Sequence, residues 1–384
     1  MAQHLKKKSA LVWCGLLLAL AVAVPSAQLM ADEKLVHGYT MEEALETAMK
    51  ENAEIRMIDE RIALAEARHK DAVDDAKYAK NRHSNDRLQD AEYRKQELVL
   101  PLSTETTLLE LKQQKEDLLL EVRLQVEGIF YQYSLLQDQH TTLQDEINNA
   151  NTKYEAQKKL VETGKAVESS LDSIEIELLR LQQRMNDLRS QQELLMIDLS
   201  QATGLDQSNF VSLVPVDVPE VSYSLDDVAA LSRTIRDTHT IVSLAETKVE
   251  IASREYDILQ KAYYQDEDLL NELESAEDAA FSARLALRDA QDQAEVKVRS
   301  DYNTILNGLD AVEIAALDRD RSLIQLEITE KRHSLGMVTD IERSQARIQA
   351  QSAEAALVQA RINAYNAVER FKHYISQVTE SESE

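Results

Sequence analysis

Glycine and proline are so scarce in this chain that they leave room for little except long helices. The 384 residues include only 7 Gly and 4 Pro. Inside a helix each of these residues costs roughly 1 to 3 kcal/mol, so long stretches without them favour uninterrupted helices. Aromatic residues make up only 5% of the chain, which is low for a sandwich or barrel of strands. We therefore expect an all-α fold with little or no β structure.

Two apolar runs flank Gly164 and predict a helical hairpin. Apolar residues alternate at steps of four and three from Val122 to Val161, and again from Leu171 to Leu199. This 3.5-residue period is typical of left-handed coiled-coil packing. A glycine ends a helix in the left-handed conformation without steric cost, so the two helices should fold back on one another as a long antiparallel hairpin.

The hairpin unit is predicted to occur twice. Thr40 is followed three positions later by Glu43, and Ser224 is followed in the same way by Asp227. We expect each pair to cap the N-terminus of a helix, because the hydroxyl accepts a backbone N–H and the acid favours the positive end of the helix dipole. Gly336 then ends a long helical stretch in the second unit, as Gly164 does in the first.

Prolines separate the two units. Pro215 and Pro219 lie where no helix interior would tolerate them. The sequence therefore predicts two tandem helical repeats and a short connection, divided as a first repeat at 32–214, a linker at 215–222, a second repeat at 223–376 and an acidic disordered tail at 377–384.

The N-terminus reads as an export signal, to which we assign residues 1–31. Three lysines at 6–8 precede an apolar run at 10–24. That run suits a signal peptide better than a spanning helix of about 20 residues, although a retained N-terminal anchor is the alternative. Cleavage would remove Cys14, the single cysteine, and leave a chain without disulfides, thiolate metal sites or a cysteine nucleophile.

The charge and the scattered histidines argue against several functions. Loss of the three signal lysines changes the formal charge from −26 to −29, which disfavours nucleic acid as a partner. No two of the eight histidines have the i, i+4 spacing of a helical metal site. Acid pairs such as Asp74 and Asp75 are better explained by a solvated helix face. We expect no enzyme activity, no cofactor and no metal.

A second apolar face predicts assembly. Leu179, Leu194 and Ile197 lie off the main stripe of their helix, so one hairpin cannot bury all of its apolar side chains. The sequence therefore predicts a curved wall of helices or an oligomer.

Together these features resemble the TolC-like outer-membrane efflux protein family over about residues 39–374. The resemblance implies a homotrimer whose six hairpins close into a hollow α-barrel. It rests on motifs that look like the family's first helix, the end of its first hairpin and its two hairpin turns: Thr40–Asn52 with Ile55, Leu199–Gly204, and the turns at Gly164 and Gly336.

The resemblance also implies a contact site at the hairpin tips. In the family these turns meet a periplasmic adaptor, a membrane fusion protein that links the barrel to an inner-membrane pump. The matching positions here are Thr163, Gly164, Lys165, Leu335, Gly336 and Met337. The first turn keeps the glycine but lacks the apolar flanks of the family pattern.

A channel-narrowing acid is implied as well. The family constricts its channel with a ring of acids after the second turn, and Glu342 stands at one such position. Gln345 stands where a second acid is usual, so the gate would be weaker or different. An exposed helix carboxylate is the alternative interpretation of Glu342.

One departure from the family concerns its membrane strands, which follow the first long helix of each repeat. A lipid-facing strand needs about 10 residues of alternating hydrophobicity. Segment 81–109 holds only a short apolar run broken by Pro101, and segment 262–284 is acidic and helical in pattern. We expect a relative that lacks the β-barrel strands, exported to the periplasm or cell envelope, that does not span an outer membrane by itself.

The leading functional hypothesis is a helical conduit component of an export or efflux assembly that docks by its hairpin tips to an adaptor and a pump. The alternative is a structural or scaffolding coiled-coil protein of the cell envelope without a role in transport.

Overall fold

The computed structural model describes residues 38–206, 212–263 and 267–378. The predicted signal at 1–31, and the acidic tail beyond residue 378, lie outside these ranges. Within them the chain has no strand, and two isolated β-bridges pair Tyr39 with Leu213 and His239 with Val378. The helices are α1 (Met41–Glu51), α2 (Ala53–Ala79), α3 (Arg87–Leu98), α4 (Leu100–Glu162), α5 (Ser169–Thr203), α6 (Val228–Thr238), α7 (Thr240–Ala262), α8 (Glu267–Ser334) and α9 (Asp340–Ser376).

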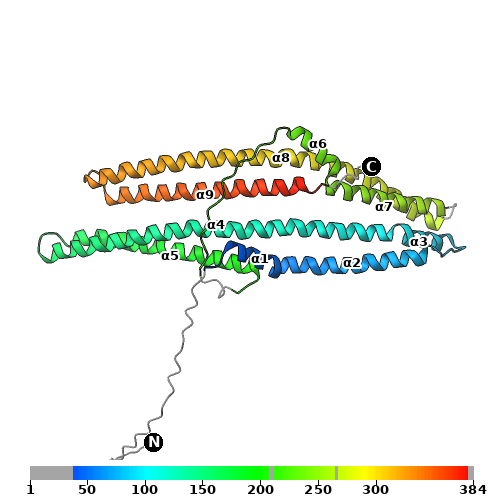
Figure 1. The fold of residues 1–384 in the computed structure, drawn as a ribbon, viewed down its shortest axis with the longest axis horizontal. Helices are drawn as coiled ribbons and strands as arrows, with labels where there is room; N and C mark the ends of the chain where they lie inside the picture. Colours follow the sequence, from blue (N-terminus) through cyan, green and yellow to red (C-terminus); the bar gives the residue numbers. More distant parts are fainter. Residues whose placement is uncertain (1–37, 207–211, 264–266, 379–384) are drawn as a thin grey trace, which may run out of the picture. The chain divides into compact units, whose positions relative to one another are not determined.

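Two very long helices, α4 and α8, organise the fold (Figure 1). The 63 residues of α4 would span about 95 Å at the usual rise of a helix. One half of α4 packs against α2 and the other half against α5, and α8 packs in the same way against α7 and α9. The chain reverses at Gly164 between α4 and α5, and at Gly336 between α8 and α9. These hairpins confirm the predicted all-α fold class.

Each set of helices has its own apolar core. In the first set, Val126 of α4 and Leu199 of α5 are fully buried together with Ala48 of α1. In the second set, Ile305 of α8 and Phe371 of α9 are fully buried in the equivalent place. Val126 and Leu199 belong to the apolar runs on either side of Gly164, so the coiled-coil pattern identified the surfaces that meet inside the first hairpin.

A buried polar side chain joins the helices at the base of each set. Asn52 separates α1 from α2; its Oδ1 accepts from the first turn of α2, and its Nδ2 donates to the carbonyl of Ala202 over 2.8 Å. His239 separates α6 from α7 in the same manner. Its Nδ1 accepts the N–H of Ile241 over 3.1 Å, and its Nε2 lies 3.2 Å from the carbonyl of Tyr374. Burial lowers the pKa of His239, which keeps the imidazole neutral as this pairing requires.

The predicted helix starts have different outcomes. Thr40 and Glu43 form the expected capping box at the start of α1. The cap predicted at Ser224 is wrong, because Asp227 caps α6 and its carboxylate accepts a backbone N–H over 2.8 Å. Leu225 explains the shift, since it packs against the second core in a non-helical segment and its N–H donates to a tyrosine hydroxyl of α8. The helix therefore begins after this anchored segment.

The segments that depart from the family pattern are largely helical. Residues 81–109 include all of α3 and the beginning of α4, with Pro101 in the first turn of α4, where its missing N–H costs nothing. The acidic segment at 262–284 lies mostly within α8, as its pattern predicts. Within the described ranges, no helix combines the length and apolar character needed to cross a membrane.

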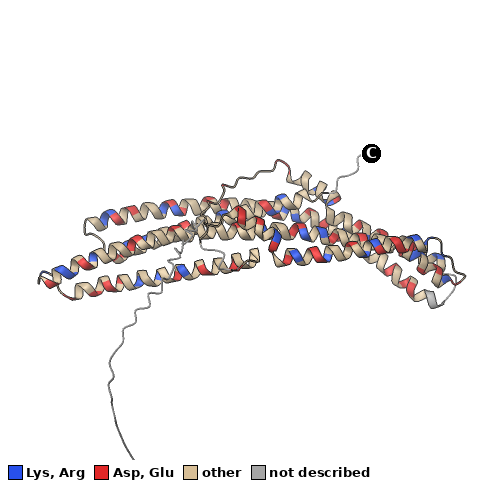
Figure 2. Ribbon diagram, turned by 60° about the horizontal axis from the view of Figure 1, so that its bottom comes forward, with Lys and Arg blue, Asp and Glu red and all other residues tan. Residues whose placement is uncertain are grey.

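Charged side chains join the two hairpins along α4 and α9. Arg370 forms a two-point pair with Glu121, at 2.9 and 2.7 Å, and Arg123 pairs with Glu369 at 2.8 Å. Figure 2 shows acidic and basic residues interspersed along the helices. Exposed ion pairs contribute about 0 to 1 kcal/mol each, so this junction is held less firmly than the apolar cores.

Glu127 is buried at the same junction. One oxygen of its carboxylate has no hydrogen-bond partner among the described residues. The rings of Tyr131 and Tyr365 meet edge to face beside it, with their centroids 6.2 Å apart. Burial raises the pKa of Glu127, although a hydrogen bond with Tyr365 and the charge of Arg123 oppose the shift.

Replacing this carboxyl should change how stability depends on pH. Because the folded-state pKa of Glu127 lies above its unfolded value, the native chain loses stability as the pH rises through that folded pKa. Glu127→Gln removes this loss, so its urea midpoint should exceed that of the native chain at pH 8. The gain should shrink toward pH 4, where the native carboxyl is protonated. Glu116→Gln, at an exposed position of α4, serves as the control. A gain that does not vary with pH would contradict the assignment.

Candidate docking site at the hairpin tips

The two hairpin tips are built by the same backbone turn. At the first tip, the N–H of Lys165 donates to the carbonyl of Leu160 over 2.8 Å. At the second, the N–H of Met337 donates to the carbonyl of Arg332 over 2.9 Å. In both turns the residue before the donor is a glycine with φ near +70°, and its own N–H bonds to a nearby carbonyl. This is the Schellman arrangement that ends a helix and turns the chain away from it.

Large apolar side chains lie exposed at these tips. Leu335 and Met337 flank the second turn with 73% and 68% of their surfaces exposed, and Ile341 follows in the first turn of α9. Apolar side chains this exposed at the end of a hairpin suit a contact with a partner protein.

The first tip also carries apolar side chains, but at positions that the resemblance did not indicate. Thr163 and Lys165 are exposed, while Val167 has 71% of its surface exposed and Leu160 has 42%. The resemblance did not indicate Val167, because the family pattern concerns only the residues beside the glycine. An apolar residue in the polar segment after Gly164 was the signal that could have identified it.

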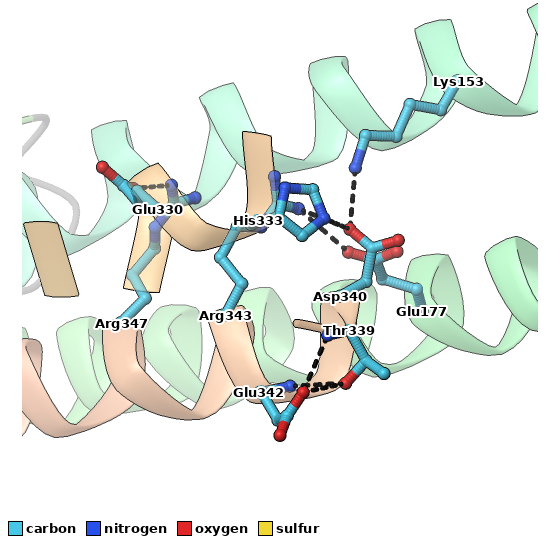
Figure 3. Close-up of polar contacts among 9 residues, drawn as sticks. All are labelled: Lys153, Glu177, Glu330, His333, Thr339, Asp340, Glu342, Arg343 and Arg347. Atoms are coloured by element: carbon cyan, nitrogen blue, oxygen red, sulfur yellow. Dashed lines mark hydrogen bonds and ion pairs between the residues drawn. The ribbon is translucent and has the colours of Figure 1, made fainter. Parts of the chain in front are cut away.

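Asp340 joins the two tips through its carboxylate (Figure 3). Oδ1 lies 3.1 Å from Nζ of Lys153 in α4 and 2.9 Å from Nε2 of His333 in α8. Arg343 in α9 approaches the same oxygen at 3.1 Å. Partial burial opposes ionisation, but the hydrogen bond from Lys153 and the surrounding cations hold the pKa of Asp340 below its usual value. One carboxylate therefore connects the first hairpin to both helices of the second.

A second ion pair group lies about two turns further along α9. Arg347 pairs with Glu330 of α8 at 2.7 Å and with Glu146 of α4 at 3.1 Å. Like Asp340, Arg347 joins side chains from both hairpins, and Figure 3 shows its pair with Glu330. The tips are thus held in a fixed relation by charges and hydrogen bonds rather than by an apolar core.

Glu342 has a local structural role. It forms a capping box with Thr339, whose hydroxyl accepts the N–H of Glu342 over 3.2 Å, while the carboxylate of Glu342 accepts the N–H of Thr339 over 2.7 Å. The bonds from Thr339 lower the pKa of Glu342. The side chain is exposed, and the start of α9 accounts for an acid at this position. Its role in narrowing a channel stays a prediction.

The fold is shared with solved outer-membrane channels. No family model and no curated protein matches the sequence. The outer-membrane channel OprN matches with a TM-score of 0.61 and 13% identity, over 88% of this chain and 90% of that one. VceC from Vibrio cholerae matches with a TM-score of 0.56 and 13% identity, over 88% and 97%. The CmeC channel from Campylobacter jejuni matches with a TM-score of 0.59 and 12% identity, over 89% and 87%. At these identities the comparison establishes the fold, in agreement with the resemblance to TolC-like proteins.

The role of Asp340 at the tips can be tested by distance measurements. Asp340→Asn removes the charge shared by Lys153, His333 and Arg343, so the two tips should separate more freely. The distribution of distances between spin labels at Lys165 and Met337 should broaden. Glu342→Gln, which alters only the capping box, should leave the distribution narrow. Equal broadening in both variants would show that Asp340 does not join the tips.

Proposed function

We propose that this chain is the helical conduit component of an export or efflux assembly in the cell envelope. Copies of the chain, three by analogy with TolC-like proteins, close around a water-filled lumen, and the hairpin tips dock to an adaptor that leads to a pump. The observation that carries this proposal is a row of helices whose two outer edges expose large apolar side chains.

The order of the helices follows from their packing. Near the tips α5 packs on α4, and α9 packs on α8, while α4 and α9 form the junction between the hairpins. In the other half, α2, α4, α7 and α8 follow in the same order. The chain is therefore a row with α2 and α5 along one edge and α8 along the other.

The edge formed by α8 carries a stripe of apolar side chains along most of its length. Its members recur near whole multiples of 3.6 residues, so they share one face of the helix. All of them are substantially exposed: Leu270, Phe281, Leu285, Val296, Leu306, Ile314, Leu317, Ile324 and Ile328. The opposite edge exposes Met57, Leu64 and Tyr78 on α2 and Ile176, Leu179, Leu194 and Ile197 on α5. A stripe of this length on both edges suits contacts between copies.

Because the two edges differ, the α8 edge of one copy would contact the α2 and α5 edge of the next, which is a head-to-tail contact. Such contacts produce either a closed ring or an open filament, depending on the rotation between copies. Closure into a ring is supported by the fold shared with channel proteins. The lumen supplies the transport path, and the similarity to channels rather than enzymes agrees with a chain that performs no catalysis.

The hairpin tips supply the docking site. Both lie at the same end of the row, as the ion pairs of Asp340 require, and both present apolar side chains beside a glycine turn. A partner that presents apolar side chains at the end of its own helices, as an adaptor hairpin does, would bury Leu335 and Met337.

Ring formation depends on the α8 edge. The purified mature chain should be a discrete oligomer by light scattering and should show a central hole in electron micrographs. Ile314→Asp with Leu317→Asp places charges in the stripe and should reduce the species to a monomer. Leu335→Asp, at a tip, should leave the ring intact. A native chain that is a monomer or a solid rod would favour the scaffolding alternative.

Docking depends on the tips. Leu335→Asp with Met337→Asp should abolish recovery of the adaptor after cross-linking in cells, because two charges would have to be buried at the contact. The ring should still form. A pair of changes at exposed positions away from the tips, Glu105→Gln with Glu116→Gln, should leave adaptor recovery unchanged. Adaptor recovery that survives the tip changes would place the docking site elsewhere.

A further inference from the structure

We propose that neighbouring copies join by packing α8 of one copy on α5 of the next, in the same register that α4 uses on α9 within one chain. The inference rests on the proposed ring and adds the residues that meet across its joints. It follows from the repeat, because the junction between hairpins inside the chain has a counterpart between chains.

A constant offset relates the two repeats. Gly336 follows Gly164 by 172 residues, and these glycines occupy equivalent positions in the two tips. Tyr374 follows Ala202 by the same 172, and their carbonyls face the equivalent side chains of His239 and Asn52. The offset is therefore the same at both ends of the hairpins, and α8 and α9 are the counterparts of α4 and α5.

The internal junction fixes a register. Lys153 pairs with Asp340, and Glu146 pairs with Arg347; in each case the two residue numbers total 493. If two copies join as the two repeats do, α8 of one copy takes the place of α4, and α5 of the next copy takes the place of α9. A residue of α8 has a number 172 higher than its counterpart in α4, and a residue of α5 has a number 172 lower than its counterpart in α9. The two differences cancel, so the numbers of two residues that meet between copies also total about 493.

This register places apolar residues opposite apolar residues. Three pairs on the facing edges total 493, and all six side chains are exposed in the single chain: Ile176 with Leu317, Leu179 with Ile314, and Ile197 with Val296. The register follows from the ion pairs of Asp340 and Arg347 alone, so these apolar matches are independent of it. Burial of such pairs is the usual source of affinity between helices that join in water.

The same register places opposite charges together. Arg180 of α5 meets Glu313 of α8, and Asp172 meets Arg321. All four side chains are exposed, and none forms an ion pair with another described residue. Such pairs flank the apolar contacts and oppose other registers.

Two like-charge pairs also fall in this register, and in one of them Glu175 of α5 would face Asp318 of α8. In the other, Asp198 of α5 would face Glu295 of α8. Glu295 is already paired with Arg299 at 2.7 Å and with Arg236 at 3.6 Å, so the two guanidinium groups offset the repulsion.

The two kinds of junction differ in character. The internal counterparts of Leu179 and Ile314 are Gln351 and Thr142, which line a cleft of about 680 Å³ between α4 and α9. At this level the internal junction has Gln351 and Thr142 beside open space, whereas the junction between copies would have Leu179 and Ile314. The apolar contact therefore lies between copies.

Cysteine pairs test the register. In a Cys14→Ser background, Leu179→Cys with Ile314→Cys should form covalent oligomers on mild oxidation. Leu179→Cys with Ile324→Cys is the matched control, because Ile324 lies ten residues further along the same stripe, about 15 Å away. A disulfide needs Cα atoms within about 7 Å, so this pair should stay unlinked. Each single cysteine should also stay unlinked.

The outcomes separate this inference from the proposed function. A ring in micrographs with linkage of the Leu179 and Ile314 positions supports both. A ring in which the Ile324 pair links instead, or in which neither pair links, overturns the register and leaves the conduit standing. A monomer without linkage overturns both.

Discussion

A helix in a single layer has neighbours on two sides, and this constraint governs the structure. Inside the row, each long helix buries one stripe within its hairpin and meets another hairpin on the opposite side. The outer helices lack a second long neighbour, although the short helix α6 packs on part of α8. Even so, α8 exposes apolar residues on one face over most of its length. Apolar surface gains about 25 cal/mol for each Å² removed from water, so a stripe of nine large side chains is a strong drive toward association. A single chain therefore leaves apolar side chains unburied along its edges.

The contacts form a hierarchy of strength. Within a hairpin, apolar side chains such as Val126 and Leu199 interdigitate without exposed surface. Between hairpins, the contacts are ion pairs such as Arg370 with Glu121, and one carboxyl, Glu127, is buried without full hydrogen bonding. Units that are firm inside and weakly joined to each other tend to move as rigid bodies. The hairpins meet that description, with Asp340 limiting their movement at the tips.

The sequence predicted those features of the fold that a local pattern determines, namely helices and turns. The heptad runs identified the helices of the first hairpin, and two glycines identified the turns of both hairpins, because periodicity and positive φ are properties of short segments. The ion pairs of Asp340 could not be predicted in this way, since Lys153 is 187 positions away and no period relates them. The cap at Ser224 failed for a related reason. A local capping signal was present, but anchoring of Leu225 against the second core delayed the helix. The tip residues were found only in part, since exposure of Val167 depends on how the turn is built.

The two sets of helices use different side chains for the same structural role. Asn52 and His239 look unrelated in the sequence, yet each ends one short helix, caps the next and bonds the end of a hairpin. An amide offers a carbonyl acceptor and an N–H donor, and a neutral imidazole offers the same two groups on its two nitrogens. Protonated histidine would lose the acceptor that caps α7, so the lowered pKa of His239 is part of the equivalence. The two side chains occupy corresponding places because both satisfy one acceptor and one donor that the buried junction demands. Either residue can therefore fill this position. An apolar residue would leave the N–H at the start of the second helix and the carbonyl at the end of the hairpin without a partner.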